Sequence, residues 1–376
     1  MAAKPAENAN RATNAKRATK AEPAPRRAAP LKNTPAKAGP GKVTLADVAL
    51  VAGVDRSVVS RVINDDPKLS IRPDTRQRVL DTIGKLGYRP NAAARSLRTA
   101  RSNMLGLFIP DFANPVYAEI IKGAETAASS LGYGLMTASS EGLRRGVESY
   151  LDLFGQSRVD GLLFAGDETG RALDQMRSLR LPWLLVNRRA AGSDRYVILD
   201  DEHGSQLAVD HLVALGHRHI AHIAGPETAD TARRRRIGYT SAMTEAGLVA
   251  DPRLIVHADY TPAGGHAALE ALLDTGTGPR PTAVFVANVA SAVGVLHALH
   301  ARGVRVPDDM SVVAVHDMPL AGHLVPALTT VRMPLGELGA RAVSLLVAST
   351  PEDSITEVVA APAEIVVRES TAPPPA

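Results

Sequence analysis

The pattern of hydrophobic and polar positions differs between two parts of this chain. Between Val43 and Leu86, apolar residues recur every three or four positions, as in short amphipathic helices. From Asn103 onward, continuous apolar runs of strand length alternate with segments of helical periodicity. The first part therefore predicts a small all-helical domain, and the second part predicts an α/β domain.

Residues that begin and end helices divide the helical part. Thr44 and Asp47 can form a capping box at the start of a first helix, and Gly53 provides a break after it. Asp55 can cap a second helix over residues 56–63. That helix exposes a polar face made of Arg56, Ser57, Ser60, Arg61 and Asn64. Two short helices joined by a tight turn, the second with an exposed polar face, are typical of a helix-turn-helix DNA-binding domain.

A third helix is predicted from Asp74 to Leu86, with Pro73 at its start and Gly87 after its end. Its apolar positions are expected to pack on the first two helices; they are Val79, Leu80, Ile83 and Leu86. The Ala-rich segment that follows, residues 90–97, is too short to be a stable helix alone.

The second part of the chain contains seven apolar runs. They are residues 104–110, 133–139, 161–166, 182–187, 219–225, 282–288 and 311–317. Helical patterns such as residues 120–131 and 205–215 separate them. This alternation predicts parallel sheets covered on both faces, and the number of strands predicts two doubly wound lobes. Ligands bind such sheets at the carboxyl ends of the strands.

The composition excludes several classes of protein. The 376 residues suffice for two or three domains, and there is no cysteine, so disulfides and thiolate metal sites are excluded. There is no apolar run of about 18 residues and no apolar core of a signal peptide near the N-terminus. We therefore expect a cytoplasmic protein, nucleoid-associated when bound to DNA, without membrane contact.

The N-terminal residues are strongly basic. Residues 1–42 carry ten Lys and Arg against two Glu, a net charge of +8, whereas the whole chain is only +4. The segment is rich in Ala and Pro and has no apolar periodicity, which predicts a disordered basic tail. It either adds attraction to DNA phosphates or is a dispensable extension.

The helical part resembles the headpiece of the lactose-repressor/galactose-repressor (LacI/GalR) family of bacterial transcription regulators. The matching stretches are TLADVA at 44–49, AGV at 52–54, VSRVIN at 59–64, TR at 75–76 and LGYRPNAAARSL at 86–97. Residues 114–125, 210–226, 235–243, 306–317 and 326–339 are similar to the family's effector-binding core. The resemblance implies an all-α helix-turn-helix headpiece and an α/β core of two doubly wound parallel-sheet lobes, like periplasmic binding proteins.

This resemblance implies a DNA-binding regulator, in the first place a repressor, which binds a near-palindromic double-stranded operator as a homodimer. Arg56 and Ser57 match the positions that contact base edges, so Arg56 either bonds guanine or contacts phosphate only. Leu97 matches the residue that wedges into the minor groove. The acid Asp55 stands where the family usually has Ser, and an acid near phosphate is unfavourable unless it is used as a helix cap. The expected DNA-binding residues are Thr44, Leu45, Arg56, Ser57, Ser60, Arg61, Asn64, Arg76, Tyr88, Asn91, Ala94, Leu97 and Arg98.

The same resemblance implies domain boundaries. They are residues 1–42 for the tail, 43–88 for the helix-turn-helix domain, 89–102 for a hinge helix and linker, 103–370 for the core and 371–376 for a second tail. Lobe 1 is expected at about 103–187 and 332–348, and lobe 2 at about 188–331 and 357–370. The chain would cross between lobes near Asn187 and Arg188, near Val331 and after about Ala348. Residues 371–376 lack a heptad, which favours a dimer over a zippered tetramer.

The resemblance also implies a small-molecule effector, a sugar or related metabolite, held between the lobes. Arg235 matches the arginine that grips the effector, and Asn288 matches the pocket asparagine. The expected effector-binding residues are Asp111, Phe112, Tyr117, Asp167, Arg235, Asn288, His316 and Asp317. His316 stands where the family usually has an acid, and Val289 where it usually has Asp. An imidazole can donate, accept or change charge, so an acidic effector is a second hypothesis.

Other functions remain as alternatives. The core alone would also suit a periplasmic-type solute-binding protein, and the regulator could be an activator or depend on a corepressor. We find no G-x-S-x-G, no G-x-x-x-x-G-K-[ST] and no G-x-G-x-x-G after a strand, so no enzyme and no cofactor are expected. His217, His219 and His222 lie around a helix end and a strand start, would point in different directions, and are not expected to bind a metal.

Overall fold

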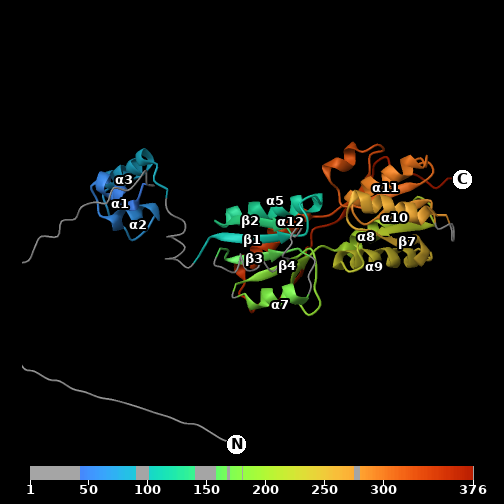
Figure 1. The fold of residues 1–376 in the computed structure, drawn as a ribbon, viewed down its shortest axis with the longest axis horizontal. Helices are drawn as coiled ribbons and strands as arrows, with labels where there is room; N and C mark the ends of the chain where they lie inside the picture. Colours follow the sequence, from blue (N-terminus) through green and yellow to red (C-terminus); the bar gives the residue numbers. More distant parts are fainter. Residues whose placement is uncertain are drawn as a thin grey trace, which may run out of the picture. The chain divides into compact units, whose positions relative to one another are not determined.

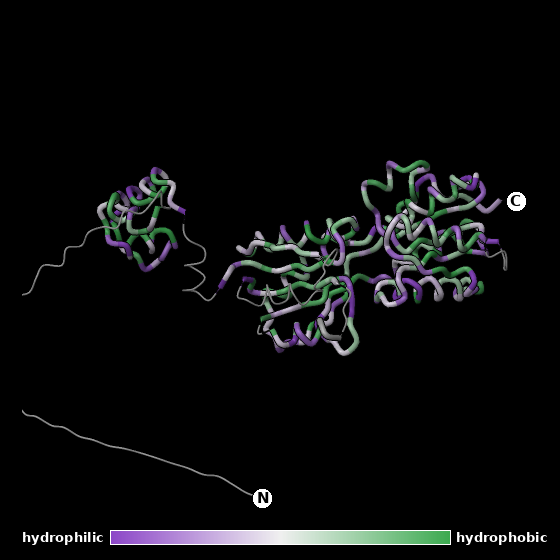
Figure 2. The backbone as a smooth tube through the Cα atoms, in the orientation of Figure 1, coloured by the Kyte–Doolittle hydropathy of each residue, from purple (hydrophilic) through white to green (hydrophobic). Residues whose placement is uncertain are grey.

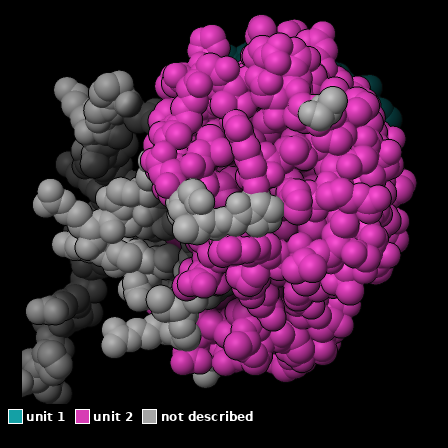
Figure 3. Space-filling model, turned by 90° about the vertical axis from the view of Figure 1, so that its right-hand side faces the viewer, with its two compact units in different colours: residues 1–90 teal, residues 91–376 magenta. Residues whose placement is uncertain are grey.

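A computed structural model describes residues 43–89, 101–139, 158–166, 170–179, 181–274 and 280–375. The chain divides into two compact units, residues 1–90 and 91–376, which have different colours in Figure 3. The predicted basic tail and nearly all of the predicted hinge lie outside the described residues. Among the residues that are described, no helix is long and apolar enough to cross a membrane.

The first unit is a three-helix domain. Its helices are α1 (Leu45–Ala52), α2 (Arg56–Ile63) and α3 (Pro73–Leu86). The Asp47 carboxylate accepts the backbone N–H of Thr44 at 2.8 Å, and the Thr44 hydroxyl accepts the N–H of Asp47 at 3.3 Å. Gly53 ends α1 with φ of 64°, a left-handed conformation that suits glycine. The predicted cap and turn residues therefore begin and end α1 as expected.

A small apolar core holds the three helices together. It centres on Val48, Val59 and Val79, one from each helix, and all three are fully buried. The prediction that Leu80 joins this core is wrong, because its side chain is 44% exposed. In α3 the inward face carries Val79 and Thr82, and Leu80 lies one residue, about 100° of helix rotation, away from it.

Lobe 1 of the second unit has a six-stranded parallel sheet in the order β11-β5-β4-β3-β1-β2. The strands are β1 (Met104–Ile109), β2 (Gly134–Ser139), β3 (Gly161–Phe164), β4 (Trp183–Val186), β5 (Arg195–Ile198) and β11 (Ile355–Val358). The helices are α5 (Pro115–Ser130), α7 (Gly170–Ser178) and α12 (Leu335–Ala348). Figure 1 shows α5 and α12 on one side of the sheet and α7 on the other, so both faces are covered.

Lobe 2 repeats this plan with the strand order β12-β10-β9-β8-β6-β7, parallel except for β12, which is antiparallel to β10. The strands are β6 (Ile220–Ala224), β7 (Ile255–His257), β8 (Ala283–Val286), β9 (Ser311–Val315), β10 (Thr329–Arg332) and β12 (Glu364–Val366). The helices are α8 (Asp201–Ala214), α9 (Asp230–Glu245), α10 (Pro262–Asp274) and α11 (Val289–Ala301), with short 3-10 turns η1 (Pro252–Leu254) and η2 (Pro319–His323). The central strands β6, β8 and β9 are buried along their whole length, as the apolar runs predict, and Figure 2 shows hydrophobic segments within the lobe.

Two of the predicted crossings between lobes are wrong. The strand β5 follows Asn187 and Arg188 yet pairs with β4 in lobe 1, so the first crossing comes after Ile198. The strand β11 also pairs with β5 in lobe 1, so the last crossing comes after Val358 rather than Ala348. Neither strand is a continuous apolar run, which is why both were missing from the predicted set.

The C-terminal residues are part of lobe 2. Ser370 is fully buried, and its hydroxyl donates to the Val312 carbonyl at 2.6 Å. The Thr371 hydroxyl lies 2.9 Å from Nε2 of His211, and the carbonyl of Ala372 lies 2.9 Å from Nε2 of His217. The segment from residue 371 is therefore docked by its hydrogen bonds and is not a separate tail.

One buried histidine makes the stability of lobe 2 depend on pH. The ring of His222 stacks between Phe285 at 4.6 Å and Tyr239 at 5.0 Å, and Nδ1 donates to the Phe285 carbonyl at 3.1 Å. Burial lowers the pKa of His222 from 6.5 to about 4, despite that hydrogen bond. Between pH 6.5 and 4 the unfolded chain therefore binds a proton that the folded chain does not, and stability decreases as pH falls through this window.

We predict that His222→Phe removes this part of the pH dependence. The pKa of His222 differs between the unfolded chain, at 6.5, and the folded chain, at about 4. This difference corresponds to roughly 3 kcal/mol of unfolding free energy between pH 7 and 4. Urea unfolding followed by circular dichroism at several pH values measures it. His219→Phe, at an exposed position, is the matched control and should keep the wild-type slope. An unchanged slope in His222→Phe would contradict the prediction.

Candidate functional site

The polar face of α2 is built by a cap that the sequence indicates. The Asp55 carboxylate accepts the backbone N–H of Ser57 at 2.8 Å and so begins α2. Hydrogen bonds from Ser57 lower the pKa of Asp55 below its usual value. The side chains of Arg56, Ser57 and Arg61 are exposed, while Val59 and Val62 are buried beneath them. The helix therefore presents its polar side to solvent, as predicted.

Several predicted DNA-binding side chains have partners within the domain. Arg76 forms an ion pair with Asp65 at 2.7 Å, and Nε of Arg61 lies 3.7 Å from the carboxylate of Asp66. The Asn64 amide donates to the Ser60 carbonyl at 2.6 Å and closes the end of α2. Both acids belong to the loop after α2, and both ion pairs are solvent-exposed, so they contribute little to stability.

Of the remaining predicted DNA-binding residues, three are described in the structure and four are not. Thr44 is exposed at the start of α1, whereas Leu45 and Tyr88 are half-buried and pack on the headpiece core. The other four lie outside the described residues: Asn91, Ala94, Leu97 and Arg98.

In the second unit, Arg235 lies at the centre of a buried polar cluster. It is 3% exposed, and Nε donates to the Asp201 carboxylate at 2.8 Å. Nη1 donates to the Ala287 carbonyl at 2.8 Å, and Nη2 lies 3.3 Å from Nε2 of His316. The guanidinium also faces the ring of Tyr260 at 5.9 Å. Arg235 therefore holds together segments from four parts of lobe 2.

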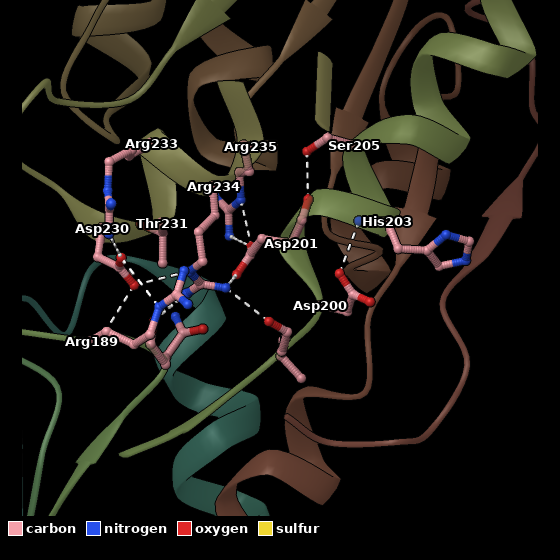
Figure 4. A network of polar contacts seen from close by, with 12 residues as sticks. Arg189, Asp200, Asp201, His203, Ser205, Asp230, Thr231, Arg233, Arg234 and Arg235 are labelled. Carbon is pink, nitrogen blue, oxygen red and sulfur yellow. Dashed lines mark hydrogen bonds and ion pairs between the residues drawn. The ribbon is translucent and has the colours of Figure 1, made fainter. Parts of the chain in front are cut away.

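Arg234, beside it on α9, links two aspartates in the same cluster (Figure 4). It contacts the carboxylate of Asp201, and Nε donates to Asp230 at 2.9 Å. It also donates to the backbone carbonyls of Leu199 at 2.8 Å and Asn187 at 3.2 Å. Burial alone would raise the pKa of Asp201, but the two arginines outweigh it and keep that pKa below its usual value. Sequence analysis missed Arg234, Asp201 and Asp230.

His316 is the third member of the cluster, and it is neutral. Burial and the neighbouring Arg235 lower its pKa to about 3, although Asp201 acts in the opposite direction. Arg235 can only donate, so Nε2 of His316 accepts and the ring proton sits on Nδ1. Nδ1 is buried and has no hydrogen-bond partner among the described residues. The described part of the site therefore contains a buried donor without an acceptor.

Two predicted effector residues, Tyr117 and Asn288, lie on other elements, together with Arg188, which was not predicted as an effector residue. Arg188 follows β4 in lobe 1, and its Nη2 donates to the hydroxyl of Tyr117 on α5 at 3.3 Å. Arg188 and Tyr117 are both buried. Asn288 is 1% exposed and caps α11 by accepting the N–H of Ser291 at 2.9 Å, while its amide donates to the Tyr260 carbonyl at 3.3 Å.

Three other predicted effector residues are not brought to Arg235, and a fourth, Asp167, lies outside the described residues. The Asp317 carboxylate is taken by Arg332 at 2.8 Å and Arg368 at 2.7 Å, so its partners are on β10 and beyond β12. Asp111 accepts the N–H of Ala113 at 2.7 Å within its own loop. The side chain of Phe112 is 54% exposed and does not line the cluster.

The three histidines of the segment 217–222 have different environments. His217 is buried and hydrogen-bonded to Thr282 and Ser311, His219 is exposed, and His222 is in the core stack. Within the described ranges, no group of His, Asp or Glu residues could hold a metal ion.

Comparisons with known proteins match both units of the chain to known families. Residues 44–91 match the family of bacterial regulatory proteins called the lacI family, and residues 209–371 match the periplasmic binding protein-like domain. The first match covers the three-helix unit, and the second covers most of lobe 2 and helix α12.

Individual relatives match along nearly their whole length. The chain is 33% identical over 338 residues to the transcriptional regulator DegA of Bacillus subtilis, which covers 88% of this chain and 99% of that protein. It is 36% identical over 307 residues to the ribose operon repressor of Escherichia coli, covering 81% and 92%. The crystal structure of the lac repressor dimer bound to operator and the anti-inducer ONPF matches with a TM-score of 0.78 and 29% identity, covering 88% of this chain and all of that one. The chain belongs to the LacI family of bacterial transcription regulators.

Proposed function

We propose that this protein is a repressor that binds a near-palindromic operator as a homodimer. In this proposal, a small-molecule effector either weakens or strengthens its binding to the operator. The observation that supports DNA binding most directly is the exposed polar face of α2, which begins at the Asp55 cap. The lac repressor structure is described as a dimer bound to operator, which supports the same arrangement here. A DNA partner also implies that the protein works in the cytoplasm and on the nucleoid.

Within α2, Arg56 is proposed to contact guanine and Ser57 a neighbouring base edge. Arg can donate two parallel hydrogen bonds to guanine O6 and N7, which no other base presents in the major groove. Arg61 and Arg76 are proposed to contact phosphates, exchanging their exposed pairing with Asp66 and Asp65 for the DNA backbone. Exposed pairs are worth little, so this exchange costs little. In the same proposal, Leu97 enters the minor groove at the operator centre.

The effector is proposed to bind at the cluster of Arg235 and His316. The cluster lies at the carboxyl ends of strands, where doubly wound sheets bind ligands. Tyr117 and Arg188 come from lobe 1, whereas Arg235, Asn288 and His316 belong to lobe 2. A ligand that contacts both lobes would favour one lobe arrangement over another and so change operator affinity.

The test is operator affinity measured with and without small molecules. Full-length protein is titrated onto its selected operator in the presence of sugars, sugar acids and nucleobases at fixed salt. We expect one class to change the affinity at least tenfold. Arg235→Lys should lose this response but keep the affinity measured without ligand, because its side chain lies in the second unit. If no compound changes operator affinity, effector control is wrong.

A further inference from the structure

We propose that the effector of this protein is an anion, bound through a carboxylate or phosphate group at His316 and Arg235. This inference rests on the proposed effector site and specifies its ligand. It follows from which hydrogen-bond donors and acceptors the cluster leaves unpaired, and from the charge that the cluster carries.

The first observation is that the carboxylates around the cluster are already occupied (Figure 4). One Asp201 oxygen accepts from Arg235, at 2.7 Å and 2.8 Å, and the other contacts Arg234. Asp230 accepts from Arg234 at 2.9 Å, from Arg233 at 2.7 Å and from the backbone N–H of Arg189 at 2.9 Å. These carboxylates are therefore poorly placed to accept hydrogen bonds from the hydroxyl groups of a neutral sugar.

The carboxylate that follows β9 is also occupied. Both oxygens of Asp317 are engaged, one by Thr330 at 2.8 Å and Arg368 at 2.7 Å, the other by Arg332 at 2.8 Å and 3.1 Å. The residue at that strand end that does face Arg235 is His316. Thus the strand end presents an imidazole to the cluster rather than an acid.

The second observation is the donor on His316. Its side chain is 1% exposed, Nε2 accepts from Arg235 at 3.3 Å, and the Nδ1 hydrogen has no acceptor among the described residues. A buried donor without an acceptor is costly, so a ligand that supplies an acceptor is favoured. Carboxylate and phosphate oxygens are acceptors, and an ionised acceptor makes the stronger hydrogen bond.

The third observation is an excess of positive charge. Among the described residues, three arginines, Arg189, Arg234 and Arg235, are buried or half-buried around two aspartates, Asp201 and Asp230, which leaves one positive charge in excess. Removing charge from water without compensation is unfavourable. An anion that enters the cluster would offset this excess, whereas a neutral ligand would not.

Calorimetry on the full-length protein tests the inference with three matched sets of compounds. These are neutral five- and six-carbon sugars, the corresponding aldonic and uronic acids, and the corresponding sugar phosphates. We expect binding in the acid set or the phosphate set, and the two sets distinguish a carboxylate from a phosphate. We expect neutral sugars to bind at least tenfold more weakly than the best anion.

Two substitutions of His316 test whether anion binding depends on its N–H donor or only on the packing of its side chain. His316→Asp replaces the donor by an acceptor of the same charge as the ligand and should weaken anion binding at least tenfold. His316→Asn keeps an N–H close to the position of Nδ1 and should retain most of the affinity. His323→Asp, at an exposed histidine of lobe 2, is the matched control and should bind like wild type. Thermal unfolding of each variant shows whether it is folded.

The outcomes distinguish this inference from the function on which it rests. A neutral sugar that binds more tightly than every anion, or equal anion binding in His316→Asp and wild type, overturns the anionic effector but leaves effector control standing. An anion that binds through His316 without changing operator affinity supports an anion-binding site at His316 but contradicts effector control. Absence of binding in the acid and phosphate sets overturns the inference.

Discussion

Replacing Arg234 with methionine is expected to lower the free energy of unfolding of the second unit by about 3–5 kcal/mol. The side chain is 2% exposed and bridges Asp201 and Asp230 (Figure 4), so its removal leaves two buried carboxylates with fewer partners. Its guanidinium also donates to the carbonyls of Leu199 and Asn187, which would lose that donor. Urea unfolding followed by the fluorescence of Trp183, the one tryptophan of the chain, measures the change.

Arg233→Met is the matched control for this prediction. Arg233 pairs with the same Asp230 at 2.7 Å, but its side chain is 57% exposed. Exposed ion pairs contribute roughly 0–1 kcal/mol, so this variant should remain within that range. Equal losses in both variants would mean that burial of Arg234 does not decide the stability of the cluster.

Replacing Arg56 with alanine is expected to weaken operator binding on the order of 100-fold. Each bidentate contact to guanine is worth roughly 1–3 kcal/mol, and a dimer loses one such contact in each half-site. Binding to unrelated DNA should change much less, since that affinity comes from phosphate contacts. The measurement is a titration of full-length protein with labelled operator and with a scrambled duplex at one salt concentration.

Lys85→Ala provides the control in the headpiece. Lys85 is exposed in the last turn of α3 and is not part of α2, so its loss should change operator affinity only a few-fold. If Arg56→Ala weakens operator and scrambled duplex equally, Arg56 contacts phosphate and does not specify a base.

Helices with clear capping residues and strands made of continuous apolar runs were predictable from sequence. The caps Thr44 and Asp55 and the turn at Gly53 set the bounds of α1 and α2, and the continuous apolar runs became strands within one or two residues. The strands β5 and β11 were not predictable in this way. Each is short and has partly exposed positions, and its place in lobe 1 depends on pairing with strands distant in sequence.

The polar cluster was predictable only in part, because its pairing is long-range. Arg235 matched the motif, but its neighbour Arg234 belongs to a run of arginines that also suits a solvated helix face. Arg234 is buried because Asp201 and the chain after β4 pack against that side of α9. Similarly, Asp317 follows a strand as a ligand residue would, yet Arg332 and Arg368 take its carboxylate. Spacing along the sequence carries no information about such partners.

The most direct test of the central claim is selection of bound DNA from a random duplex pool by the purified full-length protein at fixed salt. Two helix-turn-helix units in a symmetric dimer predict an enriched palindrome of roughly 14–20 base pairs with a G·C pair at the same place in each half-site. Binding that is strongly salt-dependent and enriches no sequence would contradict the account, because phosphate attraction alone would then explain it.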